Sequence, residues 1–131
     1  MTHDKVAYWL DLCDDDLITA KALLDSKRLL HMGFFCHMIV EKAIKAVIAD
    51  ITSEIPPRIH DLEKLAVRGN ISNDLSSEQL ALLDELGPLQ IETRYPEYKA
   101  RIAATLTYER CKQILAETEE FLCWIKQRLE K

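Results

Sequence analysis

Three residues that could act together stand four positions apart in one segment: His37, Glu41 and Lys45. Side chains at this spacing lie above one another on one face of a helix. An imidazole, a carboxylate and an amine would then form a row on an otherwise apolar segment. A polar row of this kind on a central helix usually leads to a cleft or to a binding partner. The simpler interpretation is a helix-surface ion pair between Glu41 and Lys45, with His37 capping the row.

A second group, His60 and Asp61, follows a pair of prolines at the next turn of the chain. With His37 and Glu41 it supplies two imidazoles and two carboxylates, which are metal ligands in type. Only one pair in this set has a fixed spacing, and so we predict no metal site and no cofactor. In the alternative interpretation Asp61 caps a helix and His60 hydrogen-bonds locally.

The third candidate is the segment that contains Arg94, Tyr95 and Tyr98. The planar donor fork of arginine suits phosphate, and tyrosine offers a stacking face and a hydroxyl group, as a nucleotide pocket requires. Alternatively, Pro96 fixes a turn, Tyr95 fills the end of the fold, and Arg94 pairs with an acid such as Glu41.

These groups would meet if the chain after the second helix and the chain after the fourth lie at the same end of a bundle. His60 and Asp61 would then lie near Arg94 and Tyr95, in a site suited to a phosphate next to a base. Glu41 would orient Arg94 rather than touch the ligand, since a carboxylate repels phosphate.

Helices must position these residues. The segment Gly33–Asp50 reads as one long helix that is apolar on nearly every face, and such a helix is usually buried at the centre of its fold. Asp61 can cap a short helix, and Ser76 with Gln79 forms a capping box for another, which Gly87-Pro88 must kink or end. Periodicity and proline placement predict helices over 4–24 and about 105–129, a connection over 26–32 and a loop over 94–98.

The last predicted helix carries a regular apolar seam and, beside it, a second stripe of Ile114, Phe121 and Trp124. The stripe is either a wide core face or a partner surface, and it suggests a homodimer through this helix or the first one. The whole pattern predicts an all-α fold, an up-and-down antiparallel bundle of four long helices plus one short helix, as a single domain over residues 1–131.

The composition fits a globular chain, with 48% hydrophobic and 30% charged residues, and the net charge of -5 argues against a strongly basic nucleic-acid binder. The four cysteines show no CxxC spacing and fall within apolar helical patterns, which favours a reducing compartment, the cytoplasm. No run of 18 apolar residues predicts a membrane span, and the first residues lack the pattern of a signal peptide.

The order of these segments resembles the HEPN domain family, small helical domains often found beside minimal nucleotidyltransferases. The matching pieces are Trp9, the run from Ala20 to Leu24, the run from Phe34 to Ala46, Pro56-Pro57, His60-Asp61-Leu62 and Arg94-Tyr95-Pro96. The resemblance implies an up-and-down bundle, commonly a homodimer, with nucleotide or RNA as the ligand class.

One departure from the family pattern matters. Ribonuclease members carry an arginine and a histidine separated by four to six residues on their last helices, whereas this chain has no histidine after His60. We therefore expect a non-catalytic domain that binds a nucleotide, RNA or a partner nucleotidyltransferase. The alternatives are an RNA-cleaving toxin of a toxin-antitoxin pair that uses Arg94 and His60, or a pure dimerisation module.

Overall fold

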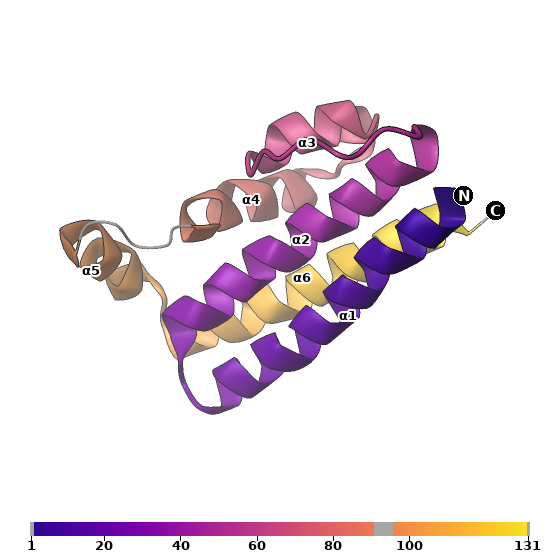
Figure 1. The fold of residues 1–131 in the computed structure, drawn as a ribbon. Coiled ribbons are helices and arrows are strands. Elements are labelled where there is room, and N and C mark those ends of the chain that lie inside the picture. Colours follow the sequence, from indigo (N-terminus) through magenta and orange to yellow (C-terminus); the bar gives the residue numbers. More distant parts are fainter. Residues whose placement is uncertain (1, 91–95, 131) are drawn as a thin grey trace.

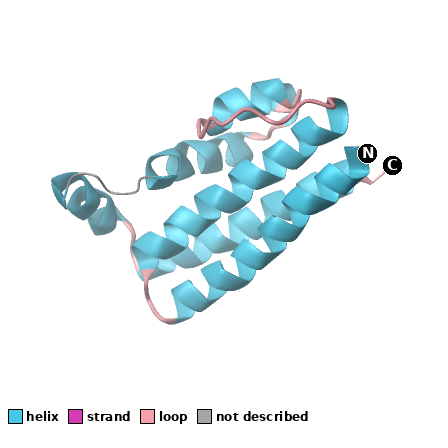
Figure 2. Cartoon of the chain, in the orientation of Figure 1, coloured by secondary structure: helices cyan, strands magenta, loops and turns pink. Residues whose placement is uncertain are grey.

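The computed structural model describes residues 2–90 and 96–130, with the side chains of residues 2, 3 and 96–99 left out of the description. Every regular element within these ranges is a helix (Figures 1 and 2). Along the chain they are α1 (Thr2–Asp25), α2 (Leu29–Ile51), α3 (Leu62–Arg68), the short 3-10 helix η1 (Ser72–Asp74), α4 (Ser77–Leu86), the 3-10 helix η2 (Gly87–Gln90), α5 (Pro96–Thr105) and α6 (Tyr108–Leu129). The all-α bundle predicted from the sequence is confirmed.

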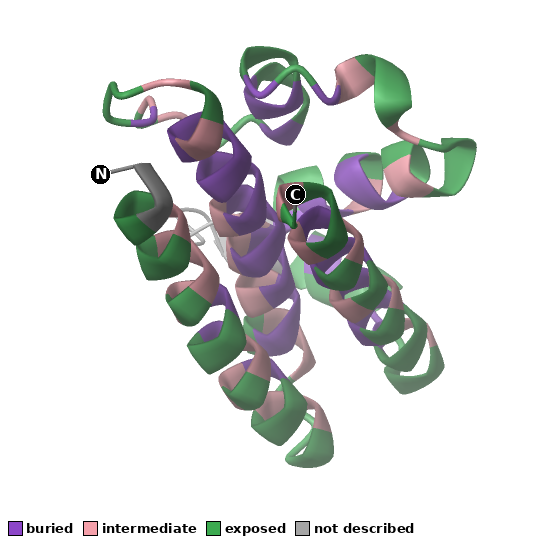
Figure 3. Ribbon diagram, turned by 90° about the vertical axis from the view of Figure 1, so that its right-hand side faces the viewer, coloured by how far each residue is buried: buried purple, intermediate pink, exposed green. Residues whose placement is uncertain are grey.

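α2 is the central helix, as the sequence predicted. It packs against α1 and α6 on one side and against α3, α4 and η2 on the other (Figure 1). α1 and α2 form an antiparallel pair, and α3 and α4 carry the chain back so that α6 runs in the same direction as α2. Figure 3 shows that burial is nearly continuous along α2, whereas α1 and α6 are buried only on their inward faces.

Local signals placed most helix ends correctly. Asp61 caps α3 by accepting from the backbone N–H of Lys64 at 3.1 Å, and both hydrogen bonds of the Ser76–Gln79 capping box are present at the start of α4. α4 ends at Gly87, where the chain tightens into η2.

Three expectations about the elements were wrong. α2 begins at Leu29, so the first connection spans only residues 26–28. Pro96 begins α5 instead of lying in a loop, because the fixed φ of proline suits the first position of a helix. Within the described ranges the bundle contains three long α-helices and three shorter ones, not four long and one short, since α4 stops after 10 residues and the chain resumes in η2 and α5.

The second apolar stripe of α6 is core rather than a partner surface. Ile114 and Phe121 are buried, and only Trp124 of the three is partly exposed, with its ring centroid 5.7 Å from that of Phe121. The stripe therefore gives no support for a dimer interface on this face. None of the helices in the described ranges combines the length and hydrophobicity needed to cross a membrane.

Ala43 tests how closely the central helix is packed. Its side chain is fully buried, and we expect Ala43→Leu to lower the free energy of unfolding by about 1–3 kcal/mol, because added methylene groups force neighbours out of their preferred rotamers. Urea unfolding would measure the change. Ala22→Leu on the exposed face of α1 is the matched control, and equal midpoints for the two variants would contradict close packing around Ala43.

Candidate functional site

A buried carboxylate on α2 joins the first two groups of candidate residues. The Oε1 atom of Glu41 lies 3.2 Å from Nε2 of His37 and 2.9 Å from Nδ1 of His60, and its Oε2 accepts from Nζ of Lys45 at 2.9 Å. Glu41 is 4% exposed, Lys45 is 7% exposed and His37 is fully buried. The predicted Glu41–Lys45 pair exists, but its interpretation as a surface pair is wrong because both partners are in the interior.

The cluster is held by three parts of the fold. The row on α2 follows from its i, i+4 spacing, and His60 comes from the segment that the Asp61 cap fixes to the start of α3. The Nζ atom of Lys45 lies 5.6 Å from the centroid of the Trp9 ring on α1. The Glu41 cluster, meaning His37, Glu41, Lys45 and His60, therefore links α1, α2 and the segment that leads into α3.

The buried histidine adds a contact to α4. Nδ1 of His37 lies 3.0 Å from the carbonyl oxygen of Leu86, which can only accept. The carboxylate of Glu41 likewise accepts, so an acceptor faces each ring nitrogen and the nitrogen that carries the proton can donate. A buried polar group with a hydrogen-bond partner avoids the penalty of an unpaired one.

The cluster also shifts the acidity of its carboxyl group. Burial by itself raises the pKa of Glu41, but hydrogen bonds from His37, His60 and Lys45 outweigh it and lower the pKa from 4.5 to about 2. Glu41 is therefore a carboxylate at neutral pH and holds its donors electrostatically as well as by geometry.

This shift predicts a pH dependence of stability. The folded-state pKa of Glu41 is depressed, so its contribution is fully present above about pH 4.5 and is lost as the pH falls toward 2. We expect this group to account for a loss of about 3 kcal/mol over that window. Urea unfolding from pH 2 to 6 would measure it, with Glu41→Gln as the control. An equal loss in Glu41→Gln would show that other groups carry the acid sensitivity.

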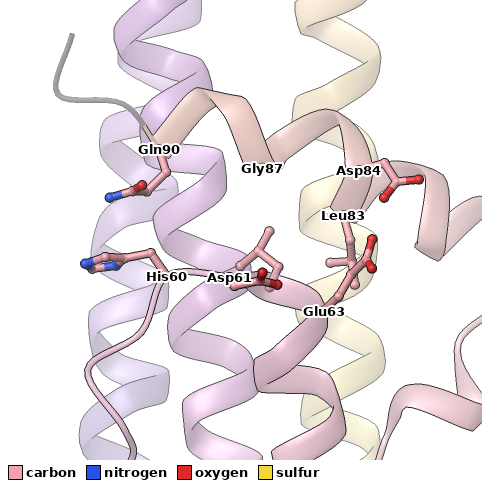
Figure 4. A pocket seen from close by; sticks show the side chains of 8 residues that line it. His60, Asp61, Glu63, Leu83, Asp84, Gly87 and Gln90 are labelled. Atoms are coloured by element: carbon pink, nitrogen blue, oxygen red, sulfur yellow. The ribbon is translucent and has the colours of Figure 1, made fainter. Parts of the chain in front are cut away.

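A pocket of about 470 Å³ opens beside the cluster, between the segment leading into α3 and the end of α4. Figure 4 shows His60 and Gln90 near one another at one end, and Glu63 close to Asp84 at the other. The full lining is His60, Asp61, Leu62, Glu63, Leu83, Asp84, Gly87 and Gln90. We call this the His60 pocket.

The charge of the His60 pocket is negative. Glu63 shares a hydrogen bond with Asp84, and that bond together with the neighbouring negative charge raises the pKa of Glu63. Asp61 is occupied by its backbone cap. No lysine or arginine lines this pocket among the described residues, so its wall offers hydrogen-bond acceptors and no cationic group to hold a phosphate.

The structure therefore brings together His37, Glu41, Lys45 and His60, with Asp61 next to them in the pocket wall. Arg94 and Tyr95 lie outside the described residues, and Tyr98 belongs to α5 with its side chain not described. Both oxygens of Glu41 already accept hydrogen bonds within the cluster. Glu63, Asp84, Gln90 and the Leu86 carbonyl were not predicted from the sequence, because no local pattern indicates that the end of α4 faces His60.

Neither the cysteines nor any group of metal-ligand side chains indicates a further site in the described ranges. Burial raises the pKa of the Cys13 and Cys36 thiols to about 12, so neither is a ready nucleophile at neutral pH. Cys123 is exposed, contrary to the expectation that every cysteine packs in an apolar face. No group of three or more histidine, cysteine, aspartate or glutamate side chains in the described ranges is placed to hold a metal ion.

Comparison with known proteins identifies the family of the chain. No curated protein and no solved structure shows significant similarity to it. The family model described as the HEPN domain matches residues 6–129, which is nearly the whole length, and the matched region contains every element that builds the Glu41 cluster and the His60 pocket. On this evidence the chain belongs to the HEPN domain family.

Proposed function

We propose that this HEPN domain is a non-catalytic binding module that takes a nucleotide, with the base in the His60 pocket. The observation that carries the proposal is the anchoring of His60: its Nδ1 is held by Glu41, while its side chain is 55% exposed at the pocket edge. A ring fixed at one nitrogen presents the other in a defined direction, which suits recognition of a polar edge.

The charge of the pocket favours a base over a phosphate. Carboxylates accept from the amino and imino groups of a purine, Gln90 can donate and accept, and Leu83 supplies an apolar wall. A phosphate placed there would face Glu63 and Asp84 and be repelled. Arg94 follows Gln90 by four residues in the chain, and we propose it as the group that pairs with the phosphate outside the pocket.

Calorimetric titration tests this proposal. Guanosine and adenosine, their monophosphates and inorganic phosphate would be titrated into the wild type, Gln90→Ala, Arg94→Ala and Arg94→Lys. Gln127→Ala on the exposed face of α6 is the matched control for Gln90→Ala. Melting curves alongside would separate loss of binding from loss of fold.

The expected results differ between the variants. Gln90→Ala weakens binding of nucleosides and nucleotides alike, whereas Arg94→Ala weakens only the nucleotides, by about 1.5–3 kcal/mol. Arg94→Lys restores part of this loss, since lysine lacks the bidentate fork. Unfolding by Arg94→Ala would make Arg94 a structural residue, and no binding by any ligand would favour the pure interaction module.

A second function is favoured by one observation, the Glu41–His60 pair itself. A buried carboxylate that holds Nδ1 of a histidine leaves Nε2 free to act as a general base, here on a ribose 2′-hydroxyl of RNA. We rank cleavage below binding, because the described lining supplies no cation to stabilise a phosphorane. Degradation of cellular RNA by the wild type but not by His60→Ala would establish the toxin function.

We also propose that the domain acts as a homodimer or with a small nucleotidyltransferase, in the cytoplasm. The four cysteines are all free thiols, in keeping with a reducing compartment. Light scattering at micromolar concentration would test self-association, and a lone 15.1 kDa species would contradict the homodimer. Co-purification with the product of a neighbouring reading frame would test the partner.

A further inference from the structure

The outward face of α1 carries a regular row of exposed residues, on the side of the helix that points away from α2 and α6 (Figure 3). The row is Tyr8, Asp11, Asp15 and Ile18, and steps of three, four and three residues place all four on one face of the helix. Tyr8 is 58% exposed and Ile18 is 69% exposed. Two large apolar side chains therefore flank two carboxylates at the surface, and we call these four residues the Tyr8 face.

The carboxylates of the Tyr8 face differ from the other acids in the middle of α1. Asp14 and Asp16 pair with lysines of α6 and α2. Both lysines of α1 have other partners, a backbone carbonyl after α2 and a glutamate of α6. Among the described residues, the side chains of Asp11 and Asp15 form no ion pair with any cation of the chain. Their negative charge is therefore directed to the solvent.

A pocket of about 350 Å³ lies at the Tyr8 end of this face, between the start of α1 and the segment that follows α2. The rings of Tyr8 and Trp9 meet edge to face in its wall, with centroids 5.4 Å apart and planes at 76°. Ile55, which is 82% exposed, and Pro56 complete the apolar part. The full lining is Asp4, Lys5, Tyr8, Trp9, Ile55 and Pro56. A pocket of this kind can take one apolar side chain of a partner.

We propose that the Tyr8 face binds a basic amphipathic helix of a partner protein. Tyr8 and Ile18 stand ten residues apart, which is about 15 Å along the helix, and the two carboxylates lie between them. A helix laid alongside α1 would match them with two apolar residues at the same separation and with lysine or arginine between. The steps of three, four and three residues read the same in both directions, so the partner helix can run parallel or antiparallel to α1.

Charge favours this occupant over the others that could cover the face. A second copy of the chain, docked through the same face by two-fold symmetry, would oppose aspartate to aspartate. Anionic lipid and nucleic acid would be repelled in the same way, whereas the net charge of -5 attracts a basic partner from a distance. The Tyr8 face shares no residue with the His60 pocket, so the inference goes beyond the proposed function and does not depend on it.

Fluorescence anisotropy with two labelled alanine-based peptides, each of about 20 residues, tests the proposal. One peptide has two leucines spaced like Tyr8 and Ile18, with two lysines spaced like the aspartates between them. The other has glutamates in place of these lysines. We expect the wild type to bind the lysine peptide about tenfold more tightly than the glutamate peptide, and this preference to shrink as salt is added.

Charge reversal on the protein provides the sharpest comparison. Asp11→Lys combined with Asp15→Lys should reverse the preference, so that the glutamate peptide binds more tightly. Glu120→Lys combined with Glu130→Lys is the matched control, since it changes the net charge equally at exposed positions of α6 and just beyond its end. The control should keep the preference of the wild type. A reversal in the control as well would show that net charge alone is read, and would overturn the proposal.

Tyr8→Ala separates the apolar contact from the charge. Because Tyr8 is largely exposed, the variant should remain folded in urea unfolding while it binds the lysine peptide about five- to tenfold more weakly. Failure of the wild type to bind either peptide would overturn the proposal, as would unchanged binding by Tyr8→Ala. Self-association of the wild type that Tyr8→Ala abolishes would also overturn it, because a second copy would then be the occupant.

Discussion

Replacing Glu41 with alanine is expected to destabilise the fold by about 3–5 kcal/mol. The change removes the shared acceptor of His37, Lys45 and His60 and leaves the Lys45 ammonium in the interior without a counter-charge. Truncating one member of a buried charged group is costly because the other members keep their desolvation penalty and lose their partner. Urea unfolding at pH 7 measures the loss.

Two further variants show whether the cost comes from the stranded charge. Glu119→Ala breaks the Lys21–Glu119 pair, whose side chains are about half exposed, and should cost about 1 kcal/mol or less. Glu41→Leu combined with Lys45→Met should recover part of the loss of Glu41→Ala, because an apolar pair leaves no buried charge unpaired. If Glu41→Ala and Glu119→Ala cost the same, the Glu41 cluster is not a structural centre.

Replacing Phe121 with alanine is expected to cost about 3–5 kcal/mol, since the ring is 2% exposed and lies between α6 and the rest of the core. The loss combines the transfer free energy of the ring with the cavity left behind. Thermal and urea unfolding measure it. Tyr8→Ala is the matched aromatic control on the surface, 58% exposed, and should cost about 1 kcal/mol or less.

The same pair of variants bears on assembly. If Phe121 lay in a dimer interface, its truncation would convert a dimer to monomers while each monomer stayed folded. Because Phe121 is core, Phe121→Ala should instead lower the stability of the protomer at every protein concentration. A concentration-dependent midpoint in the wild type that disappears in Phe121→Ala would restore the interface interpretation.

Sequence patterns predicted the parts of this molecule that short-range physics controls. The capping box at Ser76, the cap at Asp61 and the stop at Gly87-Pro88 depend on hydrogen bonds and dihedral angles within four residues. The apolar character of α2 on nearly every face identified it as the central helix, because such a helix is usually buried at the centre of its fold. The start of α5 was missed because proline both ends and begins helices, and the sequence alone did not distinguish the two.

The candidate site was predicted only in part from the sequence, and its burial and its full set of residues depend on the tertiary structure. The i, i+4 spacing placed His37, Glu41 and Lys45 in one row. The same spacing is compatible with both a solvated ion pair and a buried cluster, so it did not distinguish between them. Packing of α1 and α4 over that row made it buried, and the path of the chain after α2 brought His60 onto the same carboxylate. Burial and the meeting of distant segments depend on how whole helices pack, which residue spacing does not encode. The acidic wall of the His60 pocket arises in the same way, from α3 and α4 meeting across it.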